Sequence, residues 1–160
     1  MRFPFFGRPD PVIRPMTSDR SRAVAMIHKD FFARSWESPE IEDMLRQPGS
    51  VADVATDGRG KTVFGFAMSR VFAPEAELLT IAVDRGWQGS GIGKALLSAH
   101  LARLSAYGAG HVFLEVDEGN AAALRLYSTF GFRQVGQRPG YYAKKDGSRA
   151  TALVLRVDLG

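Results

Sequence analysis

A glycine-rich loop carries the most specific chemistry in this chain: Gln88-Gly89-Ser90-Gly91-Ile92-Gly93-Lys94. An apolar stretch typical of a strand precedes it at 78–84, and a helical stretch follows it at 95–107. Glycines at a strand-to-helix junction leave backbone N–H groups uncovered at the start of a helix, where the helix dipole favours negative charge. The loop therefore predicts a phosphate-binding site, with a flexible turn as the alternative.

The spacing of this loop excludes two familiar phosphate-binding motifs. A Walker A motif needs a glycine five residues before Gly93, where Gln88 stands, and a serine or threonine after the lysine, where Ala95 stands. A dinucleotide-binding fingerprint needs glycines spaced by two and then three residues, whereas this loop spaces them by two and two. We therefore expect the phosphate of another kind of ligand.

Two residues downstream of the loop have side chains suited to proton transfer. Glu115 lies in the alternating stretch 112–116, on the face opposite its apolar neighbours. A carboxylate in such surroundings suits a general base near neutral pH, but a strand glutamate is also commonly a solvated edge residue. Tyr127 lies in a helical stretch with apolar residues on its side, so it is either a core aromatic or a proton donor.

The elements that must position these residues are strands and helices in a mixed order. Helices are expected after Thr17 or Ser18, from Ser38 as an N-cap, after the glycine loop, and at 120–130 with Asn120 as an N-cap. Strands are expected at 12–14, 51–56, 62–72, 77–84, 111–117, 132–135 and 151–157. This order predicts an α/β (α+β) fold whose sheet is mostly antiparallel, with one parallel step where the glycine loop feeds its helix.

The strand at 77–84 has apolar residues on both faces. Strict alternation places Leu79, Ile81 and Val83 on one face and Leu78 and Ala82 on the other. Helices are therefore expected to cover both faces of the sheet.

Composition limits the class of protein. The chain of 160 residues suits a single domain at 12–158 after a tail at 1–11. It has no cysteine and no apolar run of the roughly 18 residues that a membrane span needs, so we expect a cytoplasmic protein with no membrane contact. The three histidines lack ligand spacing, so no metal is expected.

The net charge of the chain is +4. Such a small excess indicates a slightly basic surface, or attraction to a polyanionic small molecule or an RNA-rich setting. Direct binding of nucleic acid is not expected.

The Gln-x-x-Gly-x-Gly pattern and the element order resemble the GNAT superfamily of N-acetyltransferases. The match covers roughly residues 12–157 and is strongest at 78–142, where it resembles the RimI type, which acetylates the N-terminal alanine of ribosomal protein S18. Its segments are 80–84, 114–116, 120–123, 126–127, 130–132 and 141–142. The resemblance implies the GNAT fold, with helices on both faces of its sheet, and acetyl-CoA as the co-substrate.

The resemblance also implies roles for particular residues. The loop N–H groups of residues 89–94 would hold the pyrophosphate of acetyl-CoA, with Gln88 in the motif and Lys94 adding a charge. Asn120 would contact the cofactor as well as cap its helix. The backbone of Ile81, Ala82 and Val83 would hold the acetyl arm, in a strand that diverges from its neighbour and offers an N–H to the acetyl carbonyl. Glu115 would act as the general base and Tyr127 as the general acid.

The acceptor side is open to more than one interpretation. Glu77, Tyr141, Tyr142 and Trp36 are candidates to contact a peptide N-terminus, such as that of a ribosomal protein, but each could serve only in packing or at the surface. The chain also departs from many RimI-type sequences, which carry arginine at the positions of Gly89 and Lys94 and acidic residues at 148–151. An acetyltransferase of a small-molecule amine and a non-catalytic acyl-CoA-binding module remain alternatives.

Overall fold

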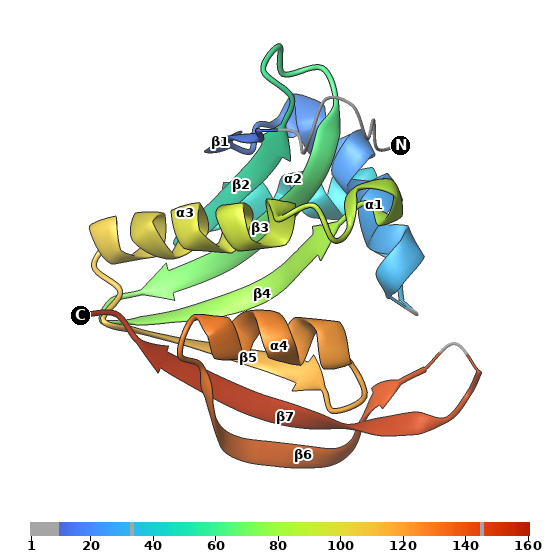
Figure 1. Ribbon diagram of the computed structural model, residues 1–160, viewed down its shortest axis with the longest axis vertical. Helices are drawn as coiled ribbons and strands as arrows, with labels where there is room; N and C mark the ends of the chain where they lie inside the picture. The colour runs from blue at the N-terminus through green and yellow to red at the C-terminus, as the bar shows by residue number, and fades with distance from the viewer. Residues whose placement is uncertain (1–9, 33, 145) are drawn as a thin grey trace.

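The sheet of this protein has helices on both faces in the computed structural model, which describes residues 10–32, 34–144 and 146–160 (Figure 1). Its strand order is β1-β2-β3-β4-β5-β7-β6, and every neighbouring pair is antiparallel except β4 and β5. The predicted mixed sheet with one parallel step is therefore confirmed. The strands are β1 (Val12–Pro15), β2 (Ser50–Thr56), β3 (Val63–Phe72), β4 (Glu75–Val83), β5 (His111–Asp117), β6 (Arg133–Ala143) and β7 (Arg149–Asp158).

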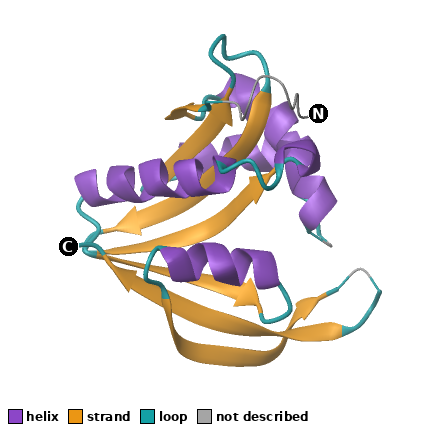
Figure 2. Ribbon diagram, in the orientation of Figure 1, coloured by secondary structure: helices purple, strands orange, loops and turns teal. Residues whose placement is uncertain are grey.

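Two pairs of helices cover the two faces of the sheet (Figure 2). On one face, α1 (Ser21–Phe31) and α2 (Ser38–Arg46) pack on β2, β3 and β4. On the other face, α3 (Ile92–Ala106) and α4 (Ala121–Thr129) pack over the main core cluster. The predicted apolar arc of α3 is buried as expected, and each such side chain contributes about 1.5–3 kcal/mol by leaving water: Ile92, Leu96, Leu97, Leu101 and Leu104.

The starts of α1 and α2 differ from prediction. A short 3₁₀ turn, η1 (Ser18–Arg20), follows Thr17, and α1 begins only at Ser21. The helix α2 includes Ser38, and its N-cap is Glu37, whose backbone N–H donates to Glu40 at 3.3 Å. The Ser38 hydroxyl instead bonds to that of Ser21 at 2.8 Å, so a contact between two helices takes the place of the expected cap.

A β-bulge in β4 changes which of its residues share a face. Met68 of β3 lies opposite Thr80 and the next residue, Ser69, lies opposite Leu78, so Leu79 is the extra residue. The prediction that Leu78 shares a face with Ala82 is therefore wrong. Leu78 joins Ile81 in the cluster under α3, whereas Ala82 packs on the side of α1 and α2.

The parallel strands β4 and β5 separate beyond their first residues. Their pairing runs from Glu75 opposite His111 to Leu78 opposite Leu114, although β4 continues to Val83 and β5 to Asp117. The arrows of the two strands diverge beside α4 in Figure 1. The predicted divergence of this strand from its neighbour is thus present in the structure.

The final hairpin is longer than predicted. The strand β6 runs to Ala143 rather than ending at 135, and it follows β7 across two register shifts. Gly136 and Pro139 interrupt the sequence pattern, because both residue types weaken a strand and are tolerated mainly at edges and bulges. β6 occupies the edge of the sheet.

Two further observations concern the limits of the chain. Most of the expected tail, residues 1–9, lies outside the described residues. Across residues 10–32, 34–144 and 146–160, no helix combines the length and the apolar character that a membrane crossing requires.

Candidate active site

A cleft of about 910 Å³ opens where β4 and β5 separate. Its walls come from residues 78–83 of β4, residues 114–117 of β5, part of the glycine loop, the first turns of α4 and the end of α1. Backbone groups at a divergence cannot pair across the gap, so a ligand placed there can reach both strands. The cleft is therefore bordered by the segments that contain the candidate residues predicted from the sequence.

Glu115 is the first residue of β5 beyond its pairing with β4, and it lines the cleft. Its side chain is 22% exposed, and Oε1 lies 3.3 Å from Nε of Arg138 on β6. Glu115 pairs with Val154 of β7 but has no partner on β4, so it lies on the open edge at the cleft, and its low exposure shows that it is not a fully solvated residue. Arg138, which sequence reasoning missed, fixes the orientation of this carboxylate, and only the pairing of β6 with β7 brings it near.

Tyr127 reaches the same cleft from the opposite face of the sheet. It is 7% exposed in the cluster under α3 and α4, with its ring centroid 5.5 Å from that of Phe132, and it also lines the cleft. Tyr127 is therefore a core aromatic that also borders the cleft, and its role as a proton donor stays a prediction. Glu115 alternates with the buried Leu114 and Val116, so the cleft passes through the sheet between the two side chains.

The glycine loop has the backbone that its sequence predicts. Gly89 has φ +74° and Gly91 has φ +87°, a left-handed region that favours glycine. The first helical bond of α3 runs from Ala95 N–H to Gly91 C=O at 3.1 Å, so the N–H groups of residues 92–94 have no acceptor within the helix. Gln88 donates to the carbonyl of Val83 at 3.2 Å, which ties the loop to β4.

The loop residues divide by their position around the cleft. Gln88, Gly89 and Gly93 line it. The side chains of Ser90 and Ile92 are buried, with the Ser90 hydroxyl bonded to the carbonyl of Trp87, and those residues offer only backbone groups. Gly91 carries the bend, and Lys94 is exposed beside the helix start.

Asn120 has the predicted capping role. Its Oδ1 accepts from the backbone N–H of Ala123 at 3.1 Å, and the residue also lines the cleft. On the other wall, Ile81, Ala82 and Val83 of β4 line the cleft as expected. These four residues are therefore brought together with Glu115 and Tyr127.

The residues predicted to contact the acceptor do not all lie at the cleft. Glu77 is exposed opposite Phe113, in the paired part of β4, and the bulge places it on the face opposite Ile81 rather than on the same face. Tyr141 is 47% exposed, and the guanidinium of Arg138 lies 5.1 Å from its ring centroid. Neither Glu77 nor Tyr141 lines the cleft, and the side chain of Tyr142 lies outside the described part of the chain.

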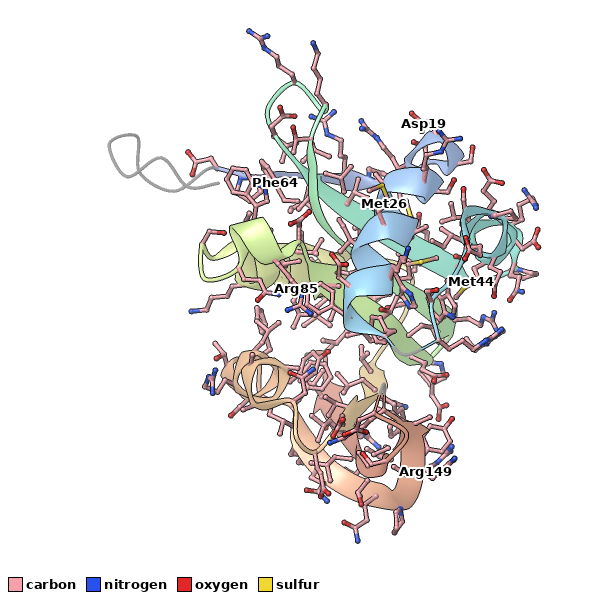
Figure 3. The ribbon with its side chains drawn as sticks, turned by 90° about the vertical axis from the view of Figure 1, so that its right-hand side faces the viewer. Asp19, Met26, Met44, Phe64, Arg85 and Arg149 are labelled. Atoms are coloured by element: carbon pink, nitrogen blue, oxygen red, sulfur yellow. The ribbon has the colours of Figure 1, made fainter. Side chains whose placement is uncertain are left out.

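The end of α1 supplies cleft residues that sequence reasoning missed. Phe31 and Phe32 line the cleft together with Asp30, whose carbonyl accepts from Arg85 at 2.8 Å. The Arg85 guanidinium also lies 4.7 Å from the centroid of the Phe31 ring, which ties the 3₁₀ turn η2 (Arg85–Trp87) to α1 (Figure 3). Two adjacent aromatic residues at the end of a helix were the available signal.

Trp36 supports this wall from behind. The buried imidazole of His28 is stacked between Phe32 and Trp36, with ring centroids 4.2 and 4.3 Å away. Its Nδ1 accepts from the backbone N–H of Trp36 at 3.1 Å. Burial lowers the pKa of His28 from 6.5 to about 4, against the opposing effect of the Glu40 carboxylate. Trp36 thus anchors the helix junction and does not line the cleft.

Metal binding has no visible site in the part of the chain that the structure covers. No group of three or more His, Cys, Asp or Glu side chains there gathers closely enough to hold an ion. The polar groups at the cleft are suited to holding an anion at the loop and to moving protons at Glu115 and Tyr127.

Comparison with known proteins gives two relatives with different substrates in their names. A [ribosomal protein bS18]-alanine N-acetyltransferase of Haemophilus ducreyi is 37% identical over 97 residues, which is 61% of this chain and 67% of that protein. A mycothiol acetyltransferase of Thermobispora bispora is 41% identical over 106 residues, which is 61% of this chain and 36% of that protein. The alignments therefore span about two thirds and about one third of these relatives.

A solved structure and a family model both match this chain. The solved ribosomal-protein-S18-alanine N-acetyltransferase of Escherichia coli has a TM-score of 0.84 and 28% identity, over 94% of this chain and 95% of that chain. A family model matches residues 21–132, a range that contains the glycine loop, Glu115, Asn120 and Tyr127. The predicted fold is confirmed, and this chain belongs to the acetyltransferase (GNAT) family.

Proposed function

We propose that this protein transfers the acetyl group of acetyl-CoA to the N-terminal α-amino group of a protein, with the N-terminal alanine of ribosomal protein S18 as the acceptor. One observation carries the proposal: the cleft passes through the sheet at the point where β4 and β5 separate, with Glu115 on one face and Tyr127 on the other. Two substrates can therefore meet there from opposite sides.

Acetyl-CoA enters on the face of α3 and α4. Its pyrophosphate binds the N–H groups of residues 89–94, where the dipole of α3 and the charge of Lys94 favour an anion. The positive φ angles of Gly89 and Gly91 let the backbone approach the phosphate oxygens. The acetyl arm follows the backbone of Ile81, Ala82 and Val83 into the cleft, and Asn120 holds it from the start of α4.

Acetyl transfer in the cleft is a direct attack. Glu115 takes a proton from the acceptor ammonium, and the amine nitrogen then bonds to the thioester carbon. The carbonyl oxygen gains negative charge, which a backbone N–H of β4 beyond the divergence stabilises. The attacking nitrogen loses its second proton to water as the C–S bond breaks, and Tyr127 gives its phenolic proton to the departing CoA thiolate and regains a proton from solvent. Arg138 holds the Glu115 carboxylate at the mouth of the cleft.

The acceptor enters on the face of α1 and α2. Phe31 and Phe32 at the end of α1 line the cleft there, and the exposed Tyr141, with the Arg138 guanidinium above its ring, lies on β6 outside the lining. We propose that Tyr141 and Tyr142 cover the acceptor peptide from β6. Trp36 acts through His28 on Phe32, and Glu77 lies near the entrance on the face of Glu115. A cytoplasmic location would give the enzyme access to ribosomal proteins.

An acetyltransferase of a small-molecule amine is the second candidate. The 41% identity to the Thermobispora mycothiol acetyltransferase favours it, because that relative's name gives a small-molecule substrate. A non-catalytic acyl-CoA-binding module would need the glycine loop but neither Glu115 nor Tyr127, and both line the cleft. The donor side supports either enzyme equally, so the acceptor decides between them.

A panel of acceptors tests the proposal. The protein is incubated with acetyl-CoA and peptides that begin with the S18 N-terminal alanine, with the same peptides carrying a blocked N-terminus, and with small-molecule amines. CoA release is followed by a thiol reagent, and the modified atom is identified by mass spectrometry. Turnover confined to free N-terminal alanine supports the proposal. Turnover of small amines without turnover of the peptides would refute it in favour of the second candidate.

A further inference from the structure

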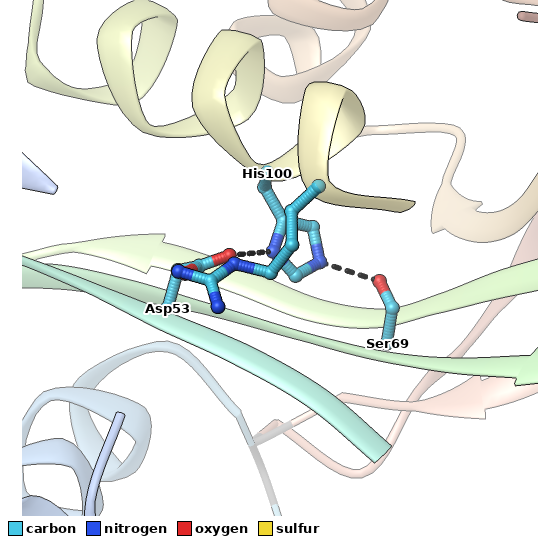
Figure 4. Close-up of polar contacts among 4 residues, drawn as sticks. Asp53, Ser69 and His100 are labelled. Atoms are coloured by element: carbon cyan, nitrogen blue, oxygen red, sulfur yellow. Dashed lines mark hydrogen bonds and ion pairs between the residues drawn. The ribbon is translucent and has the colours of Figure 1, made fainter. Parts of the chain in front are cut away.

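A buried chain of polar side chains links α3 to the sheet (Figure 4). His100 Nδ1 lies 2.6 Å from Asp53 Oδ2 on β2, and His100 Nε2 lies 2.6 Å from Ser69 Oγ on β3. Arg103, one turn further along α3, lies 2.7 Å from the other oxygen of Asp53. Asp53 and His100 have no exposed surface and Ser69 is 1% exposed, so the three groups form one closed network.

The partners in this network limit where its protons lie. An ionised carboxylate only accepts, so the proton on the Asp53 side belongs to His100 Nδ1. The Ser69 hydroxyl can donate to Nε2 or accept from it by rotating, and it has no solvent to turn to. A buried polar group that loses its hydrogen-bond partner destabilises the fold, so this geometry resists rearrangement.

The residue types match a catalytic Ser-His-Asp triad, but the placement excludes that role. A nucleophilic serine must reach its substrate, whereas Ser69 is enclosed between α3 and the sheet. Asp53, Ser69 and His100 all lie outside the lining of the cleft. Their effect on the reaction must therefore pass through the strands that they hold.

Ser69 lies at the bulge that shapes β4. The register of β3 and β4 shifts between Met68 and Ser69, and Ser69 is opposite Leu78. Leu78 is also the last residue of β4 that pairs with β5, so the bulge coincides with the opening of the cleft. The bulged residue, Leu79, and its two successors line that cleft. The hydrogen bond to His100 therefore holds the sheet at the point where the cleft begins.

We propose that Asp53, His100 and Ser69 are positioning residues for acetyl transfer, which hold the bulge so that a β4 backbone N–H points at the acetyl carbonyl. This inference rests on the proposed acetyl-transfer function. Bulges redirect a strand and leave backbone groups outside the ladder, and a slip of one residue would turn each following side chain to the other face. A hydroxyl held by a buried imidazole opposes that slip.

The helix α3 fixes the distance between the glycine loop and His100. Its N-terminus belongs to the glycine loop, and His100 follows Ile92 by eight residues, which is about 12 Å along a helix axis. One rigid element therefore holds both the anchor of the pyrophosphate and the anchor of the bulge. Loss of the His100 contact should leave the phosphate end of acetyl-CoA bound while the carbonyl end loses its alignment.

Ser69→Ala tests the proposal with the least damage to folding, because Asp53, His100 and Arg103 remain in contact. Acetyl-CoA labelled with ¹³C at the acetyl carbonyl is bound to each variant, and its carbonyl band is followed by isotope-edited infrared spectroscopy. A hydrogen-bonded carbonyl absorbs at lower frequency than the free thioester. We expect Ser69→Ala to return the band toward that of free acetyl-CoA, to lower kcat about 10- to 100-fold, and to leave acetyl-CoA affinity within about twofold.

Two further variants separate positioning from stability. Ile41→Val removes a methylene from the buried core of α2, away from the cleft, and should lower the temperature of thermal unfolding. It should keep the bound carbonyl band and kcat. Ser69→Thr retains a hydroxyl and should restore the band, with thermal unfolding showing that both Ser69 variants are folded.

Specific outcomes overturn the proposal. A bound band that Ser69→Ala leaves unchanged, a wild-type protein whose bound carbonyl does not shift, or equal losses of kcat in Ser69→Ala and Ile41→Val at equal thermal stability would each do so. If the wild-type protein binds acetyl-CoA with a shifted carbonyl but acetylates none of the acceptors, the proposed function fails instead. The infrared comparison still decides the role of Ser69 in that case, because it needs no acceptor.

Discussion

In the proposed reaction, Glu115 is the general base. Its place beyond the last β4–β5 pair leaves its carboxylate facing the gap between the strands. The Arg138 guanidinium, 3.3 Å away, orients it without closing the cleft. A base at this position must act on an amine that arrives from the face of α1, and the amide of a glutamine cannot accept the proton.

Glu115→Gln should therefore lower kcat by about 10²-fold or more at neutral pH. The affinity for acetyl-CoA should stay nearly unchanged, because the proposed contacts to its pyrophosphate are at the glycine loop. Steady-state kinetics and equilibrium binding of acetyl-CoA measure the two quantities. Glu118→Gln, an exposed carboxylate three residues further along, is the matched control and should leave both unaltered. Full turnover in Glu115→Gln would remove this residue from the role of base.

Single residues were predictable from sequence when their neighbours in the chain fix their surroundings. Alternation along β5 placed Glu115 on the face away from the core, and the helix start at Asn120 gave the cap. Arg138 was missed because its contact with Glu115 depends on β6 lying beside β7, a pairing between segments whose glycine and proline weaken the strand pattern.

At the scale of elements, the glycine loop and the start of α3 together form the proposed anion site. The loop bends at two glycines with positive φ so that the N–H groups at the start of α3 point outward. An L-residue at such a position is strained by about 1 kcal/mol or more, and the strain is released by changing the bend. A change in the bend should therefore also change the proposed anion site.

Gly91→Ala should raise KM for acetyl-CoA several-fold, because relaxing φ +87° turns N–H groups away from the pyrophosphate. Gly147→Ala is a matched control, since Gly147 also has φ +87° and a Cβ there would enter open space. Both variants should lose similar stability in thermal unfolding, but only the loop variant should change KM for acetyl-CoA. An equal rise in KM for both would show that the loop geometry is not what binds the cofactor.

Periodicity predicted the types of the elements but not the irregularities between them. The apolar face of α3 and the order of strands along the chain followed from the spacing of apolar residues alone. The bulge at Leu79 did not, because an apolar residue between apolar residues gives no sign that it is unpaired. The start of α2 was displaced because Ser38 bonds to Ser21 across two helices.

On the scale of the whole molecule, the sheet is divided at the cleft. Strands β1–β4 with α1 and α2 form one side, and β5–β7 form the other. His28 lies in the first part, stacked between Phe32 and Trp36, and so links the cleft wall to the junction of α1 and α2. Its pKa of about 4 means that the folded protein keeps this imidazole neutral through the mildly acidic range.

The acid sensitivity of the fold follows from this buried histidine. Above pH 6.5 His28 is neutral in both the folded and the unfolded chain, so it adds no pH dependence. As the pH falls from 6.5 toward 4, the unfolded chain takes up a proton that the folded protein does not, and the free energy of unfolding falls. The loss should approach about 3 kcal/mol and level off below pH 4.

His28→Phe should flatten this dependence, because phenylalanine keeps an aromatic ring between Phe32 and Trp36 and cannot take up a proton. Urea unfolding at intervals from pH 7 to pH 4.5 measures the slope, above the range in which Asp57, Asp146 and Asp158 titrate with lowered pKa values.

His111→Gln, at a half-buried position beside Glu75, serves as the control and should retain the wild-type contribution of His28. The phenylalanine variant gives up the acceptor for the Trp36 N–H, so it should be less stable at pH 7 while losing less on acidification. Equal slopes for the wild-type protein and His28→Phe would mean that another group causes the acid sensitivity.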